Sequence, residues 1–450
     1  LIKNNFILRY TLATLIFCFF QLSSAFAILF KGTIKDTYGN PLPYATIYLR
    51  NNHAVSAAAN KEGVFQIDLP LGKQELVCQY IGYQVYAKVI DVTASTPTQL
   101  NIVMQEQQYQ MKEVLIKKSK EDPAFEKRVC LTPDAVSALI ANNHKVLVES
   151  GAGNASSFTD EDYIKAGALV TKFKKEVFEC PLVLKVSPPS LLEIELIKPN
   201  SVLISAIQKN TQQKAYFTAL EAKKITAIGF ELITDRDGSF PVLKSLSQIG
   251  GTAAVHIAAE LMSSSHNGKG LLFGNMSGIP PVEVVVFGAG TAGSYAVKSA
   301  LNFGASVKVF DASVSRLRTL QNSLNVPIFT STLQPKNILK ALRRCDVAIG
   351  AQMGKNHSPI IVQESMVSHM KKGAVIIDMS IDQGGCFETS ELTTHQKPTI
   401  EKFGVIHYCV PNIPARYPKT ASVSISNICL PYLLQIAEKG GLENALRYDN

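Results

Sequence analysis

The stretch Val284-Val-Val-Phe-Gly-Ala-Gly-Thr-Ala-Gly293 determines the fold of the largest part of the chain. Its four apolar residues predict a buried strand, and its glycines follow the spacing Gly-x-Gly-x-x-Gly. A helix-like run from Ser294 to Phe303 comes next, and then an apolar strand from Val307 to Phe310. A strand, a glycine turn and a helix in this order present unpaired backbone N–H groups and the positive end of a helix dipole to a pyrophosphate. The stretch therefore predicts a dinucleotide-binding site.

The candidate cofactor contacts in this turn are Gly288, Gly290, Thr291, Ala292 and Gly293. The second strand ends on Asp311, eighteen residues after Gly293. A carboxylate at this place can accept hydrogen bonds from both ribose hydroxyls, which favours NAD over NADP. The alternative is a glycine turn that serves packing alone.

Apolar strands alternate with helical segments on both sides of this turn. The predicted strand cores are Val146–Glu149, Leu182–Val186, Ile225–Phe230, Val347–Ile349 and Ala374–Asp378. This alternation predicts parallel sheets that are covered by helices on both faces. Between residues 28 and 112 the pattern changes to short strands of period two, separated by turns rich in Gly, Asn and Pro. That region predicts a small β-sandwich.

Residues 1–27 have the pattern of a secretory signal peptide. Lys3 and Arg9 flank the start of an apolar run from Tyr10 to Leu22, and Ser23-Ser-Ala-Phe-Ala27 follows as a cleavage-site-like segment of small residues. The apolar run is too short for a comfortable membrane span. The alternative is a buried N-terminal strand or helix.

Charge and cysteine content argue against two classes of partner. The formal net charge of +9 is spread over 450 residues without a basic stripe, so no nucleic-acid interface is expected. The eight cysteines are scattered and form neither a Cys-x-x-Cys pair nor a cluster with zinc spacing, so no metal site is expected.

The predicted sandwich resembles the carboxypeptidase regulatory-like domain. The resemblance rests on Gly32 to Ala45, on Gly63-x-Phe65 and on Tyr80-Ile-Gly-Tyr83. Such domains often follow a signal peptide in bacterial envelope proteins. The resemblance implies a packing or interaction module without catalytic residues.

The region from about Val114 to the C-terminus resembles the alanine dehydrogenases. The motifs that carry the resemblance are Glu126-Lys-Arg-Val-Cys-Leu-Thr-Pro133, Leu184-Lys-Val-Ser-Pro-Pro189, Ile377-Asp-Met-Ser-Ile-Asp-Gln-Gly-Gly-Cys-Phe-Glu388 and His407-Tyr-Cys-Val-Pro-Asn-Ile-Pro414. The transhydrogenase α-subunit and the saccharopine-forming dehydrogenases share parts of this set. The Asp-Gln-Gly-Gly-Cys and Asn-Ile-Pro segments point to alanine dehydrogenase in particular.

The resemblances imply an α/β fold class, in which a Rossmann-type dinucleotide-binding domain is inserted in a second α/β substrate domain and preceded by a small all-β sandwich. The expected domains are a signal peptide at 1–27, the sandwich at 28–112, a C-terminally short substrate domain at 113–243 and 418–450, and the NAD-binding domain at 244–417.

The alanine dehydrogenase resemblance also implies roles for single residues. Arg128 and Lys185 match the two cations that bind the substrate carboxylate, for which Arg offers a bidentate fork. Asp382 matches an acid beside the nicotinamide that handles the proton on the substrate nitrogen. Ser247 matches a cofactor-contacting serine, and Asn412 matches an asparagine of the nicotinamide pocket. From the residues alone, Arg128 could form a surface ion pair, Lys185 could be a solvated strand end, and Asp382 could cap a helix.

The chain departs from the family pattern in four places. Gln208 stands where the family often has an acid/base His, and because Gln cannot titrate, proton transfer would fall to Asp382, Lys185 or water. A Ser-Glu-Ile-Ala-Gly segment appears as Ser247-Gln-Ile-Gly-Gly251, and the opening strand appears as Leu115-Ile-Lys-Lys-Ser-Lys-Glu121 without its Gly and Pro. The chain stops at Asn450, where relatives usually continue for a few dozen residues.

The implied function is NAD-dependent oxidative deamination of L-alanine to pyruvate and ammonia by a homo-oligomer, either a hexamer or a dimer. No residue in the sequence fixes the amino acid. A signal peptide implies export, whereas a free NAD pool is expected in the cytoplasm. Two alternatives therefore stay open: a non-catalytic or chimeric exported protein, joined near Lys120-Glu121, with a degenerate dehydrogenase domain, and a transhydrogenase-like hydride carrier.

Overall fold

The computed structural model describes residues 27–80, 83–105, 126–209, 212–354 and 357–438. The chain divides into two compact units, Leu1–Glu113 and Val114–Asn450. Three expectations lie outside the described residues: the signal peptide up to residue 26, the altered opening strand at 115–121, and the end of the chain after 438.

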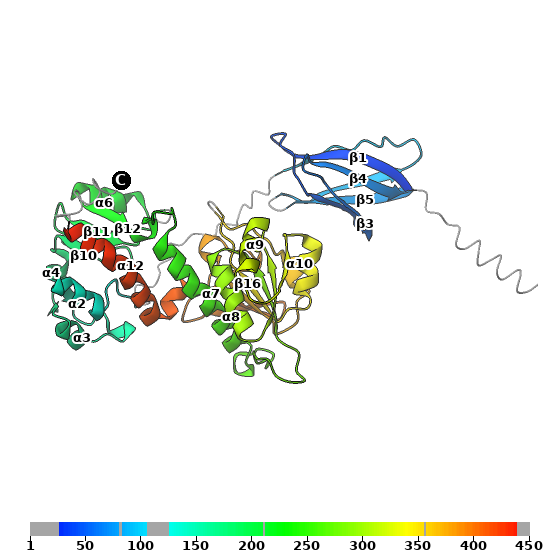
Figure 1. The fold of residues 1–450 in the computed structure, drawn as a ribbon. Helices are drawn as coiled ribbons and strands as arrows, with labels where there is room; N and C mark the ends of the chain where they lie inside the picture. The colour runs from blue at the N-terminus through cyan, green and yellow to red at the C-terminus, as the bar shows by residue number, and fades with distance from the viewer. Residues whose placement is uncertain (1–26, 81–82, 106–125, 210–211, 355–356, 439–450) are drawn as a thin grey trace, which may run out of the picture. The chain divides into compact units, whose positions relative to one another are not determined.

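The first unit is a sandwich of two sheets around one core (Figure 1). Its strands are β1 (Ala27–Asp36), β2 (Thr46–Leu49), β3 (Asn52–Ala58), β4 (Val64–Pro70), β5 (Gly72–Gln79), β6 (Tyr86–Val92) and β7 (Ile102–Met104). One sheet has the order β4-β1-β7 and the other β3-β2-β5-β6. In β4 the side chains of Phe65, Ile67 and Leu69 are buried while their neighbours face solvent, as period two requires. The predicted β-sandwich is confirmed.

The second unit begins with a small parallel α/β layer. Its elements are α2 (Pro133–Ala141), β8 (Leu147–Glu149), α3 (Asp160–Lys165), β9 (Leu169–Thr171), α4 (Lys174–Phe178), β10 (Leu182–Leu184), α5 (Leu191–Leu196), β11 (Val202–Ser205), α6 (Lys214–Ala222), β12 (Thr226–Gly229) and the 3₁₀ turns η2 (Asn154–Ser156) and η3 (Phe230–Leu232). Strands β10, β11 and β12 form one parallel sheet, and β8 pairs with β9 in another. Leu203 packs toward α5 and α6, and Ile204 packs toward the C-terminal helix, so the three-stranded sheet is covered on both faces.

The larger sheet of this unit has seven strands in the order β15-β14-β13-β16-β17-β19-β18. They are β13 (Glu283–Phe287), β14 (Ser306–Phe310), β15 (Phe329–Ser331), β16 (Val347–Gly350), β17 (Val375–Asp378), β18 (Thr399–Lys402) and β19 (Val405–Tyr408). All pairs are parallel except β18 with β19, so the expectation of a purely parallel sheet is wrong at this edge. The strand order reverses between β13 and β16, which is where such sheets bind their ligands.

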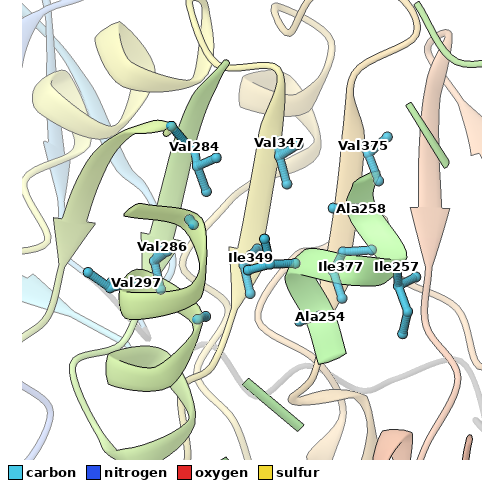
Figure 2. Packing of buried hydrophobic residues seen from close by; sticks show 14 of the residues in the cluster. Ala254, Ile257, Ala258, Val284, Val286, Val297, Val347, Ile349, Val375 and Ile377 are labelled. Carbon is cyan, nitrogen blue, oxygen red and sulfur yellow. The ribbon is translucent and has the colours of Figure 1, made fainter. Parts of the chain in front are cut away.

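Helices cover both faces of the seven-stranded sheet. On one face lie α7 (Pro241–Leu261), α8 (Thr291–Asn302) and α9 (Val314–Asn322), and on the other α10 (Pro335–Leu342) and α11 (Glu364–Val367). Figure 2 shows Val284 and Val286 of β13 in the layer of side chains between the sheet and helices α7 and α8. Val285 and Phe287 point into the opposite layer, as alternation along a strand requires. The predicted Rossmann-type fold is confirmed.

Two 21-residue helices complete the second unit, α7 and α12 (Pro418–Glu438). Helix α7 continues without a break across residue 243, where one expected domain would end and the next begin. It packs on α8 of the larger sheet and also on α12, which covers the smaller sheet (Figure 1). Among the described helices, none combines the length and apolarity needed to cross a membrane.

Candidate active site

The glycine turn lies at the carboxyl end of β13. Neighbouring backbone atoms leave no room for a side chain at two of its glycines. Gly288 has a φ of +116°, and a Cβ there would lie 2.4 Å from the carbonyl oxygen of Ala351, which follows the neighbouring strand β16. A Cβ on Gly293 would lie 1.8 Å from the carbonyl oxygen of Gly288. At Gly290, by contrast, no atom lies within 4 Å of a built Cβ. The turn therefore leaves open space at the N-terminus of α8, where the expected pyrophosphate fits.

Asp311 directly follows β14, and its side chain binds the backbone of the glycine turn. Its side chain is buried, and its Oδ2 accepts a 2.7 Å hydrogen bond from the backbone N–H of Ala289. Its Oδ1 accepts a second one, also of 2.7 Å, from the N–H of Ser313. The acid thus lies beside the glycine turn, as the sequence predicts. Its carboxylate also fixes the turn, which the sequence did not indicate.

Ser247 lies half-buried on α7, the helix that packs against the start of α8. One turn further along, Gly251 permits the close approach, because a Cβ there would lie 2.0 Å from the carbonyl oxygen of Ala292. Residues four apart share a helix face, so Ser247 is on the side that faces the glycine turn.

The loop that carries Asp382 is organised by a different acid, Asp378, at the end of β17. The Asp378 carboxylate is fully buried and accepts hydrogen bonds from the backbone N–H groups of Ser380 and Cys386 and from the hydroxyl of Ser390. Burial raises the pKa of Asp378, against the effect of these hydrogen bonds. Asp382 itself is exposed in the short turn η5 (Ile381–Gln383). Asp378 therefore positions the loop and leaves Asp382 accessible.

Asn412 lies next to Asp382 across the carboxyl edge of the sheet. Its backbone N–H donates to Asp382 Oδ2 over 3.4 Å, and its φ of +51° places it in the left-handed region, for which Asn is well suited. The structure thus brings these two predicted residues together, although β17 and β19 are separated in sequence.

His407, in the same motif as Asn412, is a buried structural side chain. Its relative exposure is 0%, Thr389 Oγ1 lies 2.7 Å from its Nε2, and the Val405 carbonyl oxygen lies 2.9 Å from its Nδ1. Burial lowers its pKa to about 4. The folded protein therefore keeps this ring neutral at pH values where the unfolded chain would protonate it.

We expect this histidine to make the protein acid-sensitive. Because its folded pKa is depressed, its contribution to stability is complete above the unfolded value of about 6.5 and is lost as the pH falls toward 4. The free energy of unfolding from urea titrations should drop by about 3 kcal/mol over that window on its account. His407→Gln should flatten this part of the pH profile, while the exposed control His369→Gln should keep the wild-type slope. An unchanged slope in His407→Gln would contradict the assignment.

The second group of predicted residues lies at the carboxyl edge of the three-stranded sheet. Lys185 directly follows β10, and Gln208 follows β11, so parallel pairing places both on one edge. The Lys185 Nζ donates to Ser187 Oγ over 3.0 Å and lies 3.8 Å from Glu193 Oε2. With 27% of its side chain exposed, Lys185 is a held, partly accessible cation and not a solvated strand end.

Arg128 forms an ion pair, but not at the surface. Its Nε donates to Glu126 Oε1 at 2.8 Å and its Nη2 to Oε2 at 2.6 Å, and only 6% of its side chain is exposed. Helix α12 holds the segment on either side: Ser422 Oγ accepts from the N–H of Val129 and Ser426 Oγ from the N–H of Thr132. Glu126 therefore fixes the orientation of the guanidinium group, and α12 fixes the backbone of the segment that carries it.

The buried thiol of Cys130 responds to both predicted cations. Burial raises the pKa of Cys130 most, and Cys429 and Glu126 raise it further. The positive charges of Arg128 and Lys185 both act on the same thiol in the opposite direction. Both cations thus act on Cys130, while each also has an acidic neighbour, Glu126 for Arg128 and Glu193 for Lys185.

Several residues of these two edges were missed by sequence reasoning. They are Glu126, Asp378, Ser422 and Glu231, whose carboxylate contacts the backbone at Gln208. A signal existed only for Asp378, a carboxylate that ends an otherwise apolar strand. Among the described residues, no three His, Cys, Asp or Glu side chains gather so as to hold a metal ion.

Comparisons with known proteins agree with this geometry. Residues 118–250 match the family model "Alanine dehydrogenase/PNT, N-terminal domain" and residues 254–450 match "Alanine dehydrogenase/PNT, C-terminal domain". Residues 30–116 match the CarboxypepD_reg-like domain. An alanine dehydrogenase of Methanococcus maripaludis is 39% identical over 73% of this chain and 88% of its own length. One of Bacillus subtilis is 38% identical over 72% of this chain and 86% of its own length.

Solved structures give the same result. An L-alanine dehydrogenase superposes with a TM-score of 0.70 and 34% identity, covering 73% of this chain and 91% of that one. A transhydrogenase from Sinorhizobium meliloti has a TM-score of 0.63 and 26% identity, covering 71% and 92%. Behind its CarboxypepD_reg-like domain, the chain therefore belongs to the alanine dehydrogenase/PNT family.

Proposed function

We propose that this protein is an NAD-dependent alanine dehydrogenase that converts L-alanine to pyruvate and ammonia. The observation that carries the proposal is the glycine turn at the carboxyl end of β13, with Asp311 bound to it, in a unit whose α7 also packs in the core of the smaller sheet that carries Lys185. The two predicted cations, Arg128 and Lys185, suit a small carboxylate substrate. The family membership supports the same reaction class, an NAD-dependent amino-acid dehydrogenase.

NAD is the proposed cofactor in preference to NADP. The support is Asp311, a buried carboxylate at the end of β14 and beside the glycine turn. A carboxylate at this place can accept hydrogen bonds from the ribose hydroxyls of NAD, and its negative charge disfavours the 2′-phosphate of NADP. Gly288, Gly290, Thr291, Ala292 and Gly293 would hold the pyrophosphate, and Ser247, Asp382 and Asn412 would line the remainder of the site.

In the proposed mechanism, NAD supplies the acceptor for the hydride that leaves Cα of the substrate. Arg128 and Lys185 bind the carboxylate and fix the direction of that C–H bond, and such positioning supplies much of the rate acceleration. Asp382, exposed at its loop, accepts the proton released from the substrate nitrogen. Loss of the hydride leaves an imine at Cα, and water adds to it, supplies the oxygen that becomes the pyruvate carbonyl and displaces ammonia. The Gln208 amide would donate a hydrogen bond to that oxygen.

The test is NADH formation, followed by its absorbance, with the purified full chain, NAD and L-alanine at alkaline pH. We expect turnover with NAD and, because of Asp311, at least about tenfold lower kcat/KM with NADP. A preparation that is folded and binds NAD but forms no NADH with L-alanine contradicts the proposal. Hydride exchange between NADPH and an NAD analogue without L-alanine would favour a transhydrogenase-like reaction, for which the structural similarity to that enzyme speaks.

Two further proposals concern the state in which the enzyme works. We propose a homo-oligomer, a hexamer or a dimer, as the sequence resemblance implies. We also propose that the first 27 residues act as a signal peptide, since they combine early basic residues, a short apolar run and a cleavage-like segment.

A further inference from the structure

One carboxylate, that of Glu231, binds the backbone of the turn that carries Gln208. Glu231 lies in η3, directly after β12, and β12 pairs with β11 so that Ser205 is opposite Gly229. Its Oε1 accepts a 2.8 Å hydrogen bond from the N–H of Ile207 and another of 2.8 Å from the N–H of Gln208. Hydrogen bonds to an ionised acceptor are about twice as strong as neutral ones. Glu231 is thus a strong fixed anchor for this turn.

The turn needs such an anchor because its backbone is unusual. Gln208 has a φ of +50°, in the left-handed region that residues with a Cβ seldom adopt. A residue persists there only when its surroundings hold it. Glu231 binds the N–H of Gln208 itself and that of the preceding residue, Ile207. Its hydrogen bonds therefore hold the part of the backbone that has the unfavourable φ.

The protein encloses the second carboxylate oxygen of Glu231. Its Oε2 is buried and has no hydrogen-bond partner among the residues that the structure describes. A Cβ on Gly229 would lie 3.0 Å from this oxygen, so a larger residue there would crowd the carboxylate. Burial raises the pKa of Tyr216 to about 12, and the charge of Glu231 adds to the effect.

We propose that Glu231 is a positioning residue of the active site, which holds Gln208 in the conformation that presents its amide to the substrate. The inference deepens the proposed function, because Gln208 has this task only if the protein is a dehydrogenase of this type. Glu231 acts through the backbone of residues 207 and 208 and does not touch the substrate. Gln208 cannot titrate, so its contribution depends entirely on where its amide is placed.

The test is a double-mutant cycle between Glu231→Ala and Gln208→Ala, measured as kcat and KM for L-alanine and NAD. Each single variant should lower kcat by about thirtyfold and leave the KM for NAD within about twofold. If Glu231 acts only through Gln208, the double variant should be no slower than Gln208→Ala alone. Glu231→Gln keeps an acceptor oxygen and should recover most of the rate. The control Glu176→Ala removes a carboxylate in the same domain, bound by Thr171, and should have wild-type kinetics.

Amide hydrogen exchange of the peptide around residues 206–209 gives a readout independent of activity. Exchange should accelerate by about tenfold or more in Glu231→Ala, stay near the wild-type rate in Glu231→Gln, and not change in Glu176→Ala. Additive effects in the cycle, or unchanged exchange in Glu231→Ala, would overturn the inference.

The two levels of the proposal fail in different ways. A wild-type chain without turnover removes the dehydrogenase function, while the exchange experiment still decides whether Glu231 holds the turn. Should Glu231→Ala not fold, the cycle is run with Glu231→Gln, whose smaller loss of rate must also vanish in the Gln208→Ala background.

Discussion

Replacing Lys185 by alanine should lower kcat/KM for L-alanine by about a thousandfold, while NAD still binds within about twofold of its wild-type affinity. Losing a charged partner in a desolvated pair costs about 4 kcal/mol, and each 1.4 kcal/mol corresponds to about tenfold in rate. The proposed NAD site is on the other sheet of this unit, so the affinity for NAD should not respond. Steady-state kinetics and NADH fluorescence titration measure the two quantities separately.

The chain offers a matched control in Lys174, which pairs with the same carboxylate as Lys185. Its Nζ lies 2.7 Å from Glu193 Oε1, but its side chain is 46% exposed on α4. Lys174→Ala should therefore change kcat/KM by less than about threefold, because exposed ion pairs contribute little. Loss of NAD binding in Lys185→Ala would show that the residue supports the fold of the unit and not the substrate.

The fold could be predicted wherever the pattern is local. The apolar run before Gly288, the glycine spacing and the helix after it are all within twenty residues, and periodicity reports such elements well. The edge strands β15 and β18 were not predicted, because none of their residues is buried and neither has the continuous apolar run of an inner strand. Helix α7 belongs to the cores of both sheets, and no composition change marks that.

Sequence reasoning could identify only those residues of the site that lie within short continuous motifs. Arg128, Lys185, Asp382 and Asn412 were found from short motifs. The structure places the last three after the carboxyl ends of β10, β17 and β19, and Arg128 in the segment before α2 that α12 holds. What holds them in place is distant in sequence: Val129 donates to Ser422, 293 residues away, and Gln208 to Glu231, 23 residues away. Single-sequence patterns carry no information about such pairs.

These supporting contacts share one physical design. Polar side chains distant in sequence bind the backbone of a segment that carries a predicted site residue and fix the position of that segment. Asp378 does this for the Asp382 loop, Glu231 for Gln208, and Ser422 and Ser426 for the segment of Arg128. Reactive groups whose loops are fixed in this way need little reorganisation when the substrate binds.

Two glycine substitutions in the dinucleotide turn should separate folding from cofactor binding. In Gly293→Ala the new Cβ would lie 1.8 Å from the Gly288 carbonyl oxygen, so the turn must open. We expect NAD affinity to fall by at least about a hundredfold and the free energy of unfolding to fall by about 3 kcal/mol. In Gly290→Ala the Cβ meets no atom within 4 Å, and the φ of −73° suits alanine. That variant should be as stable as the wild type.

Gly290→Ala should nevertheless bind NAD at least about tenfold more weakly, because its methyl group would occupy the space next to the helix N-terminus where the pyrophosphate approaches the backbone. Calorimetric titration with NAD and urea unfolding of the same samples measure affinity and stability. Full affinity in Gly290→Ala would mean that the dinucleotide does not approach this glycine, and the turn would then serve packing alone. Stability loss only in Gly293→Ala, with affinity loss in both, is the result that a phosphate-binding turn requires.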